Sequence, residues 1–312
     1  MSVQTPLRIA TRKSKLALWQ AGHVAALLRR AHPGLDIELV PVTTQGDRIQ
    51  DRSLAAIGGK GLFIKELEVA ISERRADIAV HSMKDVPADV PAEFQIAAVL
   101  ERADARDALV AAAGIARLED LPLRARVGTS SLRRQAQLYA ARPDLRIETL
   151  RGNVDTRLRR LDSGADLDAI LLACAGLMRL GLESRITVRL DPKICLPAVG
   201  QGVIGIECRN ADVRTRELLQ PLEDPGTRCV LEAERAFAAR LGGSCQSPIA
   251  AHAQLHAEQL SLAGLVAEPD GSRLLRDTIQ GSAGQANSLG RLLAERLLAA
   301  GAADLLERLR TA

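Results

Sequence analysis

Positive charge is concentrated in the segment from Thr129 to Arg160. This segment holds eight arginines and three acids, a local excess of five positive charges, whereas the whole chain of 312 residues has a formal net charge of +4. Guanidinium groups pair with planar oxyanions such as carboxylates and phosphates through parallel hydrogen bonds. The segment therefore indicates a binding surface for an anionic small molecule. A solvated helix face with the same charge stays open as an alternative.

Lys84 and Asp85 form a second candidate, because they follow closely on the apolar run Ile78-Ala-Val80. An acid beside a cation at the end of a strand is either half of a structural ion pair or the one negative group that a cationic site needs. From these residues alone the ion pair is favoured. His81 has no second metal ligand near it in the sequence, so we expect a packed or orienting residue and no metal site.

Cys245 stands in a loop of small residues, Gly242-Gly-Ser-Cys245, where a thiol would be accessible. It would be reactive only if that loop faces positive surroundings. Five widely spaced cysteines without a C-x-x-C motif fit neither a disulfide framework nor a zinc site. We expect the other four to be small packed residues: Cys174, Cys195, Cys208 and Cys229.

Alternating apolar strands and amphipathic helices position these residues. Over the first two thirds of the chain this alternation predicts an α/β organisation with parallel pairing and right-handed crossovers. The run 203–206 is expected to return to the first sheet. The expected strands are 7–10, 37–42, 78–80, 126–129, 146–150 and 167–173, and the expected helices include 14–30, 62–75 and one ending near 141.

From about Asp224 the pattern changes to that of a small α+β domain with an antiparallel sheet. Its expected elements are a helix over 228–241, strands over 249–255, 259–266 and 272–279, and a final helix from 286.

In open α/β sheets, ligands bind outside the carboxyl ends of the strands, and helix N-termini there attract anions. The segments at those ends are Thr11–Ser14, 43–48, Ser82–Asp85, Thr129–Arg134, Arg151–Arg157 and Arg179.

Composition excludes several classes of protein. Aromatic residues make up 2% of the chain, which argues against a single-strand nucleic-acid binder that stacks bases. The longest uncharged apolar run, 108–116, is half of the ~18 residues that a membrane helix needs. Arg8 and Arg12 interrupt the stretch where a signal peptide would be apolar. We expect a cytoplasmic protein that binds neither nucleic acid nor membrane.

Two alternative functions would require features that the sequence does not show. A phosphoribosyltransferase of similar shape would need a pyrophosphate loop and a metal-binding acid pair, and neither is visible in the sequence. A solute-binding protein for an organic anion would carry a signal sequence and would have no use for Cys245.

Seven segments spread over nearly the whole chain resemble the porphobilinogen deaminase (hydroxymethylbilane synthase) family and occur in its order. Ser244 and Ser247 depart from the family pattern, which usually has glycine and an apolar residue there. The matching segments are Arg8-Ile-Ala-Thr-Arg12, Gly58-Gly-Lys-Gly-Leu-Phe63, His81-Ser-Met-Lys-Asp-Val-Pro87, Val127-Gly-Thr-Ser-Ser-Leu-Arg-Arg134, Leu150-Arg-Gly-Asn153, Leu196-Pro-Ala-Val-Gly-Gln-Gly202 and Cys245-Gln246.

The resemblance implies a three-domain monomer. Two α/β domains like those of type II periplasmic binding proteins would surround a cleft, formed by residues 1–102 with 200–221 and by residues 103–199. A small C-terminal α+β domain, residues 222–312, would carry the Cys245 loop. The implied function is that of a transferase in porphyrin and haem biosynthesis. It condenses four porphobilinogen molecules head to tail, with loss of ammonia, into hydroxymethylbilane.

The resemblance also assigns roles to residues. Cys245 would hold a dipyrromethane cofactor by a thioether, and Asp85 would be the catalytic acid that stabilises cationic intermediates. Each pyrrole ring bears an acetate and a propionate, which suits an arginine-rich site. The residues implied to bind cofactor are Lys84, Arg133, Arg134, Ser130 and Thr129. Those implied to bind substrate are Arg12, Ser14, Arg151, Arg157, Arg179 and, in a glycine-rich loop over the cleft, Phe63 and Lys60.

Overall fold

The computed structural model describes residues 6–48, 61, 64–111, 114–164, 166–242 and 247–311. Lys60, Phe63 and Cys245 lie outside the described residues. The chain divides into two compact units: Met1–Arg102 with Val203–Arg228, called unit 1 here, and Ala103–Gly202 with Cys229–Ala312, called unit 2. The three-domain boundaries expected from the sequence stay a prediction.

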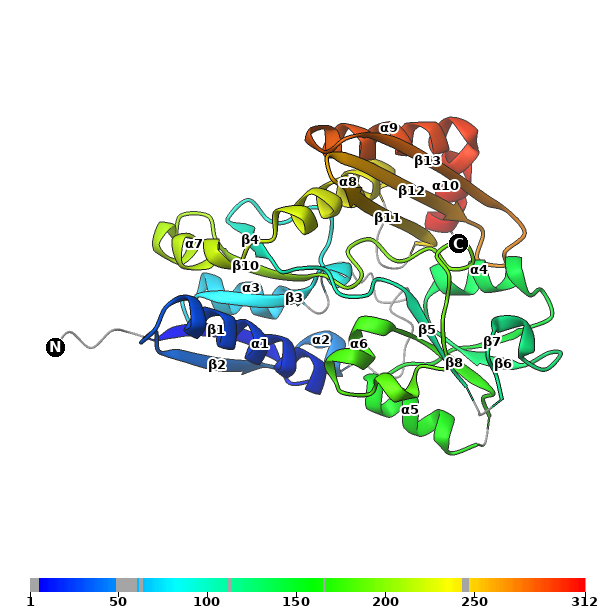
Figure 1. The fold of residues 1–312 in the computed structure, drawn as a ribbon, viewed down its shortest axis with the longest axis horizontal. Coiled ribbons are helices and arrows are strands. Elements are labelled where there is room, and N and C mark those ends of the chain that lie inside the picture. Colours follow the sequence, from blue (N-terminus) through cyan, green and yellow to red (C-terminus); the bar gives the residue numbers. More distant parts are fainter. Residues whose placement is uncertain are drawn as a thin grey trace. The chain divides into compact units, whose positions relative to one another are not determined.

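Unit 1 is built on a sheet whose described strands have the order β2-β1-β3-β10-β4 (Figure 1). Strand β1 pairs in parallel with β2 and β3, whereas β10 runs antiparallel to β3 and β4. Its elements are β1 (Leu7–Arg12), α1 (Lys15–Ala31), β2 (Ile37–Val42), α2 (Gln45–Arg48), α3 (Lys65–Ser72), β3 (Ile78–Ser82), β4 (Phe94–Val99), β10 (Ile204–Arg209) and α7 (Val213–Leu219).

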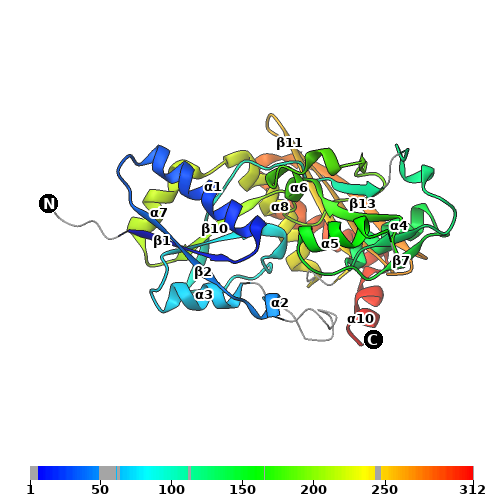
Figure 2. The ribbon, with the colours of Figure 1, turned by 90° about the horizontal axis from the view of Figure 1, so that it is seen from below.

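Two hydrophobic cores cover the two faces of this sheet. Figure 2 shows α1 and α3 on opposite sides of β1 and β2. Because side chains alternate along a strand, Ile9 packs with Val24 of α1, while its neighbour Ala10 packs with Leu67 of α3. Ser14 starts α1 by accepting a hydrogen bond from the Ala17 amide at 3.3 Å.

The larger part of unit 2 repeats this plan, with the described strand order β7-β6-β8-β5-β9. Strand β6 is parallel to β7 and β8, and β5 is antiparallel to β8 and β9. The elements are β5 (Asp107–Ala111), β6 (Arg126–Gly128), α4 (Leu132–Ala141), β7 (Arg146–Glu148), α5 (Val154–Asp162), β8 (Ala169–Ala173), α6 (Cys174–Arg179) and β9 (Val188–Arg189).

The C-terminal part of unit 2 is an antiparallel sheet, β11 (Ile249–His256), β12 (Gln259–Ala267) and β13 (Leu274–Ser282). Three helices accompany this sheet: α8 (Pro225–Leu241), α9 (Ala286–Leu297) and α10 (Ala303–Thr311) (Figure 1). All three contribute residues to its core, in which Phe237 of α8 is fully buried. Gly264 leaves room for that ring, because a Cβ atom there would lie 2.7 Å from it. The small α+β domain expected from the sequence is confirmed.

Most expected elements are present, but not every strand has the expected direction. The expected return of run 203–206 to the first sheet is confirmed by β10. The expected parallel pairing is confirmed for β1 with β2 and β3 and for β6 with β7 and β8, but β10 and β5 are antiparallel to their neighbours. Each enters its sheet directly from the other unit, without the crossover helix that parallel pairing requires. Strands β4, β5 and β9 and the short helix α2 were not predicted.

Among the described residues, every helix is too short or too polar to span a bilayer.

Substitution of Gly205 tests how closely Met83, just after β3, packs against β10. A Cβ atom at Gly205 would lie 2.1 Å from the sulfur of Met83, which is buried. Gly22, in the middle of α1, has no atom within 4 Å of the corresponding position. We expect Gly205→Ala to lower the free energy of unfolding by about 1–3 kcal/mol through overpacking. Gly22→Ala should instead raise it by about 0.5–1 kcal/mol. Urea unfolding of both variants checks this, and an unchanged stability for Gly205→Ala would contradict the packing.

Candidate active site

In unit 1 the sequence-predicted residues come together at one edge of the sheet. Strands β1 and β3 are parallel, so their carboxyl ends meet there. Arg12 ends β1, and Ser14 caps α1. Lys84 and Asp85 lie on a 3₁₀ turn, Met83–Asp85, directly after β3, and both side chains are partly exposed. The structure thus groups these four candidates around the ends of neighbouring strands.

The turn that carries Asp85 is fixed at several points. The Met83 amide donates to the Val203 carbonyl at 3.0 Å, and the Val86 amide closes the turn on the Met83 carbonyl at 3.1 Å. Just before the turn, Gln20 of α1 donates to the Ser82 hydroxyl at 2.8 Å. These bonds join the turn to Val203, just before β10, and the end of β3 to α1, so Asp85 stands on a rigid support.

His81 is buried in the strand that leads to this turn. Its Nε2 lies 2.9 Å from Oε2 of Glu207 on the neighbouring strand β10, and both side chains are almost fully buried. The expectation of a packed residue at His81 is confirmed. The pKa of Glu68 is raised, first by burial of its own carboxyl group and then by the nearby Glu207 carboxylate.

Unit 2 also gathers its candidates at the carboxyl edge of its sheet. Strands β6 and β7 are parallel, and Thr129 and Arg151 follow them. The Ser130 hydroxyl donates to the Leu150 carbonyl at 2.5 Å, which ties the two loops together. Arg157 donates from Nε to the Gly152 carbonyl at 2.8 Å. Hydroxyl and guanidinium groups therefore lie at the starts of α4 and α5, which are capped by Ser131 and Asn153.

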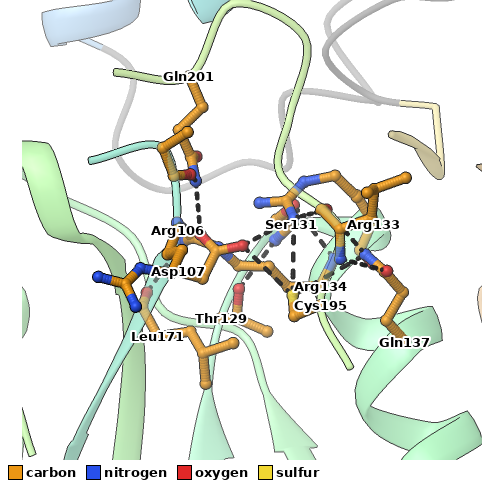
Figure 3. A network of polar contacts seen from close by, with 12 residues as sticks. Arg106, Asp107, Thr129, Ser131, Arg133, Arg134, Gln137, Leu171, Cys195 and Gln201 are labelled. Atoms are coloured by element: carbon orange, nitrogen blue, oxygen red, sulfur yellow. Dashed lines mark hydrogen bonds and ion pairs between the residues drawn. The ribbon is translucent and has the colours of Figure 1, made fainter. Parts of the chain in front are cut away.

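Arg133 and Arg134 meet on one buried carboxylate, that of Asp107 (Figure 3). Nη1 of Arg133 donates to Oδ2 of Asp107 at 2.7 Å, and Nη2 and Nε of Arg134 donate to Oδ1 at 2.7 and 3.0 Å. Cys195 donates from its sulfur to Oδ2 at 3.2 Å, and Gln201 donates from Nε2 to Oδ1 at 3.0 Å. Asp107 has no exposed surface, and the two arginines retain 4% and 5%.

The two guanidinium groups keep Asp107 ionised. Burial alone would raise its pKa, but the charges of Arg133 and Arg134 outweigh burial and hold the pKa well below its ordinary value. Burial raises the pKa of the neighbouring Cys195 thiol to about 12, so this sulfur stays protonated at neutral pH. The cluster of Asp107, Arg133 and Arg134 therefore has a net charge of +1.

The arginines of the basic segment serve different purposes. Arg142 pairs with Asp144 at 2.6 Å and donates to the Leu118 carbonyl at 3.1 Å, so it supports the fold. Arg159 and Arg160 are exposed on α5, as the solvated-face alternative supposed. The direct contact of Arg133 and Arg134 with cofactor carboxylates stays a prediction. Several of their N–H groups are already bound to Asp107 and to backbone carbonyls.

Arg179 ends α6 and is partly buried. Its Nη2 donates to the Gly202 carbonyl at 2.7 Å, and burial lowers its pKa to about 10. The side chain is therefore still charged at neutral pH. Gly202 is needed at this contact, because its φ is +87° and a Cβ atom would lie 2.5 Å from the Ala103 carbonyl oxygen.

Sequence analysis missed Asp107, Gln201 and Glu207 as members of these clusters. One signal was available for Asp107: an acid at the first position of the apolar run that forms β5. A carboxylate next to a buried strand needs a buried cationic partner. The sequence alone could not identify that partner among 36 arginines.

The described residues form an α/β protein with two five-stranded sheets and a small C-terminal α+β domain, and candidate cationic side chains lie at the carboxyl edges of the two larger sheets. The chain is similar to the periplasmic aliphatic sulphonate binding protein SsuA from Escherichia coli. The identity is 16%, over 75% of this chain and 70% of that one, with a TM-score of 0.41. It is also similar to the BenM effector binding domain with its effector benzoate, at 19% identity over 71% and 91% of the chains and a TM-score of 0.44.

Two family models match nearly the whole chain. They are the porphobilinogen deaminase dipyromethane cofactor binding domain, over residues 7–217, and the porphobilinogen deaminase C-terminal domain, over residues 227–299. The chain is 57% identical to the porphobilinogen deaminase of Xanthomonas campestris pv. campestris, over 98% of this chain and 100% of that one. It is 56% identical, with the same coverage, to that of Xanthomonas euvesicatoria pv. vesicatoria. The chain therefore belongs to the porphobilinogen deaminase family.

The Asp107 cluster predicts a pH-dependent stability. Asp107→Asn leaves two buried cations without their carboxylate, which should cost about 3–5 kcal/mol at pH 7. A carboxylate with a lowered folded-state pKa stabilises above its unfolded pKa of about 3.9 and loses that contribution as the pH falls toward the folded value. The stability gap between wild type and variant should thus stay constant from pH 5 to 8 and narrow below about pH 4. Urea unfolding across this range measures it, and a gap that widens in acid would contradict the assignment.

Proposed function

We propose that Asp85 and Cys245 perform the chemistry of this enzyme, Asp85 as catalytic acid and Cys245 as the attachment point of its cofactor. The reaction follows from the family: the chain is a transferase that condenses porphobilinogen into the linear tetrapyrrole hydroxymethylbilane on a dipyrromethane cofactor. The observation that carries the role of Asp85 is its rigid turn at a sheet edge that it shares with Arg12 and Lys84.

The residues present fit a dipyrromethane by the chemistry of their donors. The cofactor's two rings bear acetate and propionate groups, which need cations and hydroxyl donors. In unit 2, Thr129, Ser130, Arg133 and Arg134 stand at the start of α4, and in unit 1 Lys84 stands beside Asp85. We propose that these five residues hold the cofactor, together with the thioether to Cys245. When bound, the cofactor supplies the free pyrrole carbon to which the first substrate is joined.

Asp85 has the charge that this chemistry requires. Positive charge develops on a pyrrole ring as ammonia leaves, and a site of cations alone would disfavour it. A fixed carboxylate stabilises that charge and accepts hydrogen bonds from pyrrole N–H groups. Its rigid support matters, because a preorganised group loses no energy to reorientation during the reaction. Asp85 would also assist proton transfer.

The remaining cations and one hydroxyl orient the substrate through its carboxylates. We assign this role to five residues at the sheet edges: Arg12, Ser14, Arg151, Arg157 and Arg179. Their support differs, because Ser14 also caps α1, whereas Arg157 and Arg179 are each held by a backbone carbonyl. The substrate contacts of Lys60 and Phe63, which lie outside the described residues, are proposed from the sequence alone. A cytoplasmic location and a monomeric state are proposed on the same basis.

The first test is the mass of the protein. Purified wild type should be heavier than its sequence by two linked pyrrole units, and peptide mapping should place them on Cys245. Cys245→Ser should lack the added mass and the activity, since a hydroxyl cannot replace the thiolate nucleophile. Cys229→Ser, at a partly buried cysteine of the same C-terminal region, should keep both. Added mass on a cysteine other than Cys245 would refute the attachment site.

The second test concerns Asp85. Asp85→Asn should keep the fold but lose turnover by roughly a hundred- to a thousandfold, as for other preorganised electrostatic groups. Asp89→Asn, four residues further on and exposed, is the matched control and should retain normal turnover. Formation of hydroxymethylbilane is measured by the absorbance of the porphyrin that it yields on cyclisation and oxidation. Near-normal turnover in Asp85→Asn would remove Asp85 from the catalytic role.

A further inference from the structure

We propose that Asp107 is a positioning residue of the active site: it orients Arg133 and Arg134 toward the cofactor carboxylates and holds the backbone run 200–202 beside them. This inference rests on the proposed function, because the cofactor is the anion that the arginines would meet. Asp107 itself is fully buried and would not touch the cofactor.

Asp107 fixes the two guanidinium groups tightly. Arg134 donates twice to Oδ1 of Asp107, and its third nitrogen donates to the Leu171 carbonyl at 2.9 Å. Arg133 donates from Nη1 to Oδ2 and to the Leu196 carbonyl at 2.6 Å. An arginine in solution samples many rotamers, and these bonds hold each one in a single orientation.

The cluster of Asp107, Arg133 and Arg134 also carries an excess of positive charge. Two guanidinium groups against one carboxylate give the cluster a net positive charge, and the start of α4 adds the partial charge of a ten-residue helix. A buried excess of positive charge attracts an anion at the nearest accessible point. Ser130, which directly precedes the helix cap, is exposed at this end of α4. The cluster is therefore built to favour a carboxylate at the start of α4.

Asp107 is also linked to the run that leads into β10. Gln201 donates to Oδ1 of Asp107 at 3.0 Å and to the Ala105 carbonyl at 2.6 Å (Figure 3). On one side of it, the Gly200 amide donates to Glu234 at 2.7 Å. On the other side, Gly202 accepts from Arg179 at 2.7 Å. The carboxylate that orients the arginine pair thus also holds a segment that contacts another site residue.

The experiment compares Asp107→Asn with Asp144→Asn. Asp144 accepts hydrogen bonds from Arg142, which caps the C-terminus of α4. Asp144 and Arg142 are therefore a matched ion pair at the other end of the same helix. Holoprotein is purified from cells, and the fraction carrying the two-pyrrole mass is measured by intact-mass spectrometry. KM and kcat for porphobilinogen are then measured at pH 8, with folding checked by circular dichroism.

We expect Asp107→Asn to carry the cofactor in fewer than about half of its molecules and to raise KM roughly tenfold, with kcat of the loaded fraction changed less. Asp144→Asn should keep wild-type occupancy and KM. Because Asp107→Asn is expected to be destabilised, Asp107→Glu is the second variant. It keeps the charge but displaces the carboxylate by one methylene, and we expect its KM to rise at least about threefold.

The outcomes separate this inference from the proposed function. Wild type without the added mass on Cys245 would remove the proposed function, and the positioning role with it. Wild type with that mass, combined with equal occupancy and KM in Asp107→Asn and Asp144→Asn, would overturn the positioning role alone. If Asp107→Asn cannot be purified folded, wild-type occupancy and KM in Asp107→Glu would overturn the positioning role.

Discussion

The buried contact of Asp107 with Arg133 and Arg134 is the interaction on which unit 2 depends most. A carboxylate without exposed surface is stable only with charged partners, and here two arginines from one helix supply them. The contact fixes the start of α4 against the first residue of β5. It also holds Arg133 and Arg134 within the fold, so their positive charge has a fixed position at the start of α4.

Unit 1 supports its candidate side chains in a different way. The catalytic acid proposed for unit 1 is Asp85, and its support is a turn bonded to Val203, just before β10, and packed over Gly205. In both units the candidate side chains follow the carboxyl ends of parallel strands. The antiparallel strands β5 and β10 bring the chain from the other unit to the same sheet. The same sheet plan thus presents candidate cations in one unit, and candidate cations with the proposed catalytic acid in the other.

The sequence predicted the helices and most strands because their apolar periodicity is regular, as in α1. It did not predict β4, β5 and β9, or the direction of β10, because strand direction depends on where the chain enters a sheet rather than on local pattern. The hydroxyl and arginine motifs lie at the carboxyl edges of both sheets, as the sequence predicted, whereas their role in the site stays a proposal. The partner of Arg133 and Arg134 could not be found, since Asp107 lies 26 residues away and any of several acids could have served.

The most direct test of this account is a crystal structure of the holoenzyme. We predict a thioether at Cys245, with Asp107 still accepting hydrogen bonds from both arginines within about 3 Å while a cofactor carboxylate lies against the start of α4. Asp85 should face a pyrrole N–H. A structure in which the arginines leave Asp107, or in which the cofactor carboxylates lie far from α4, would contradict it.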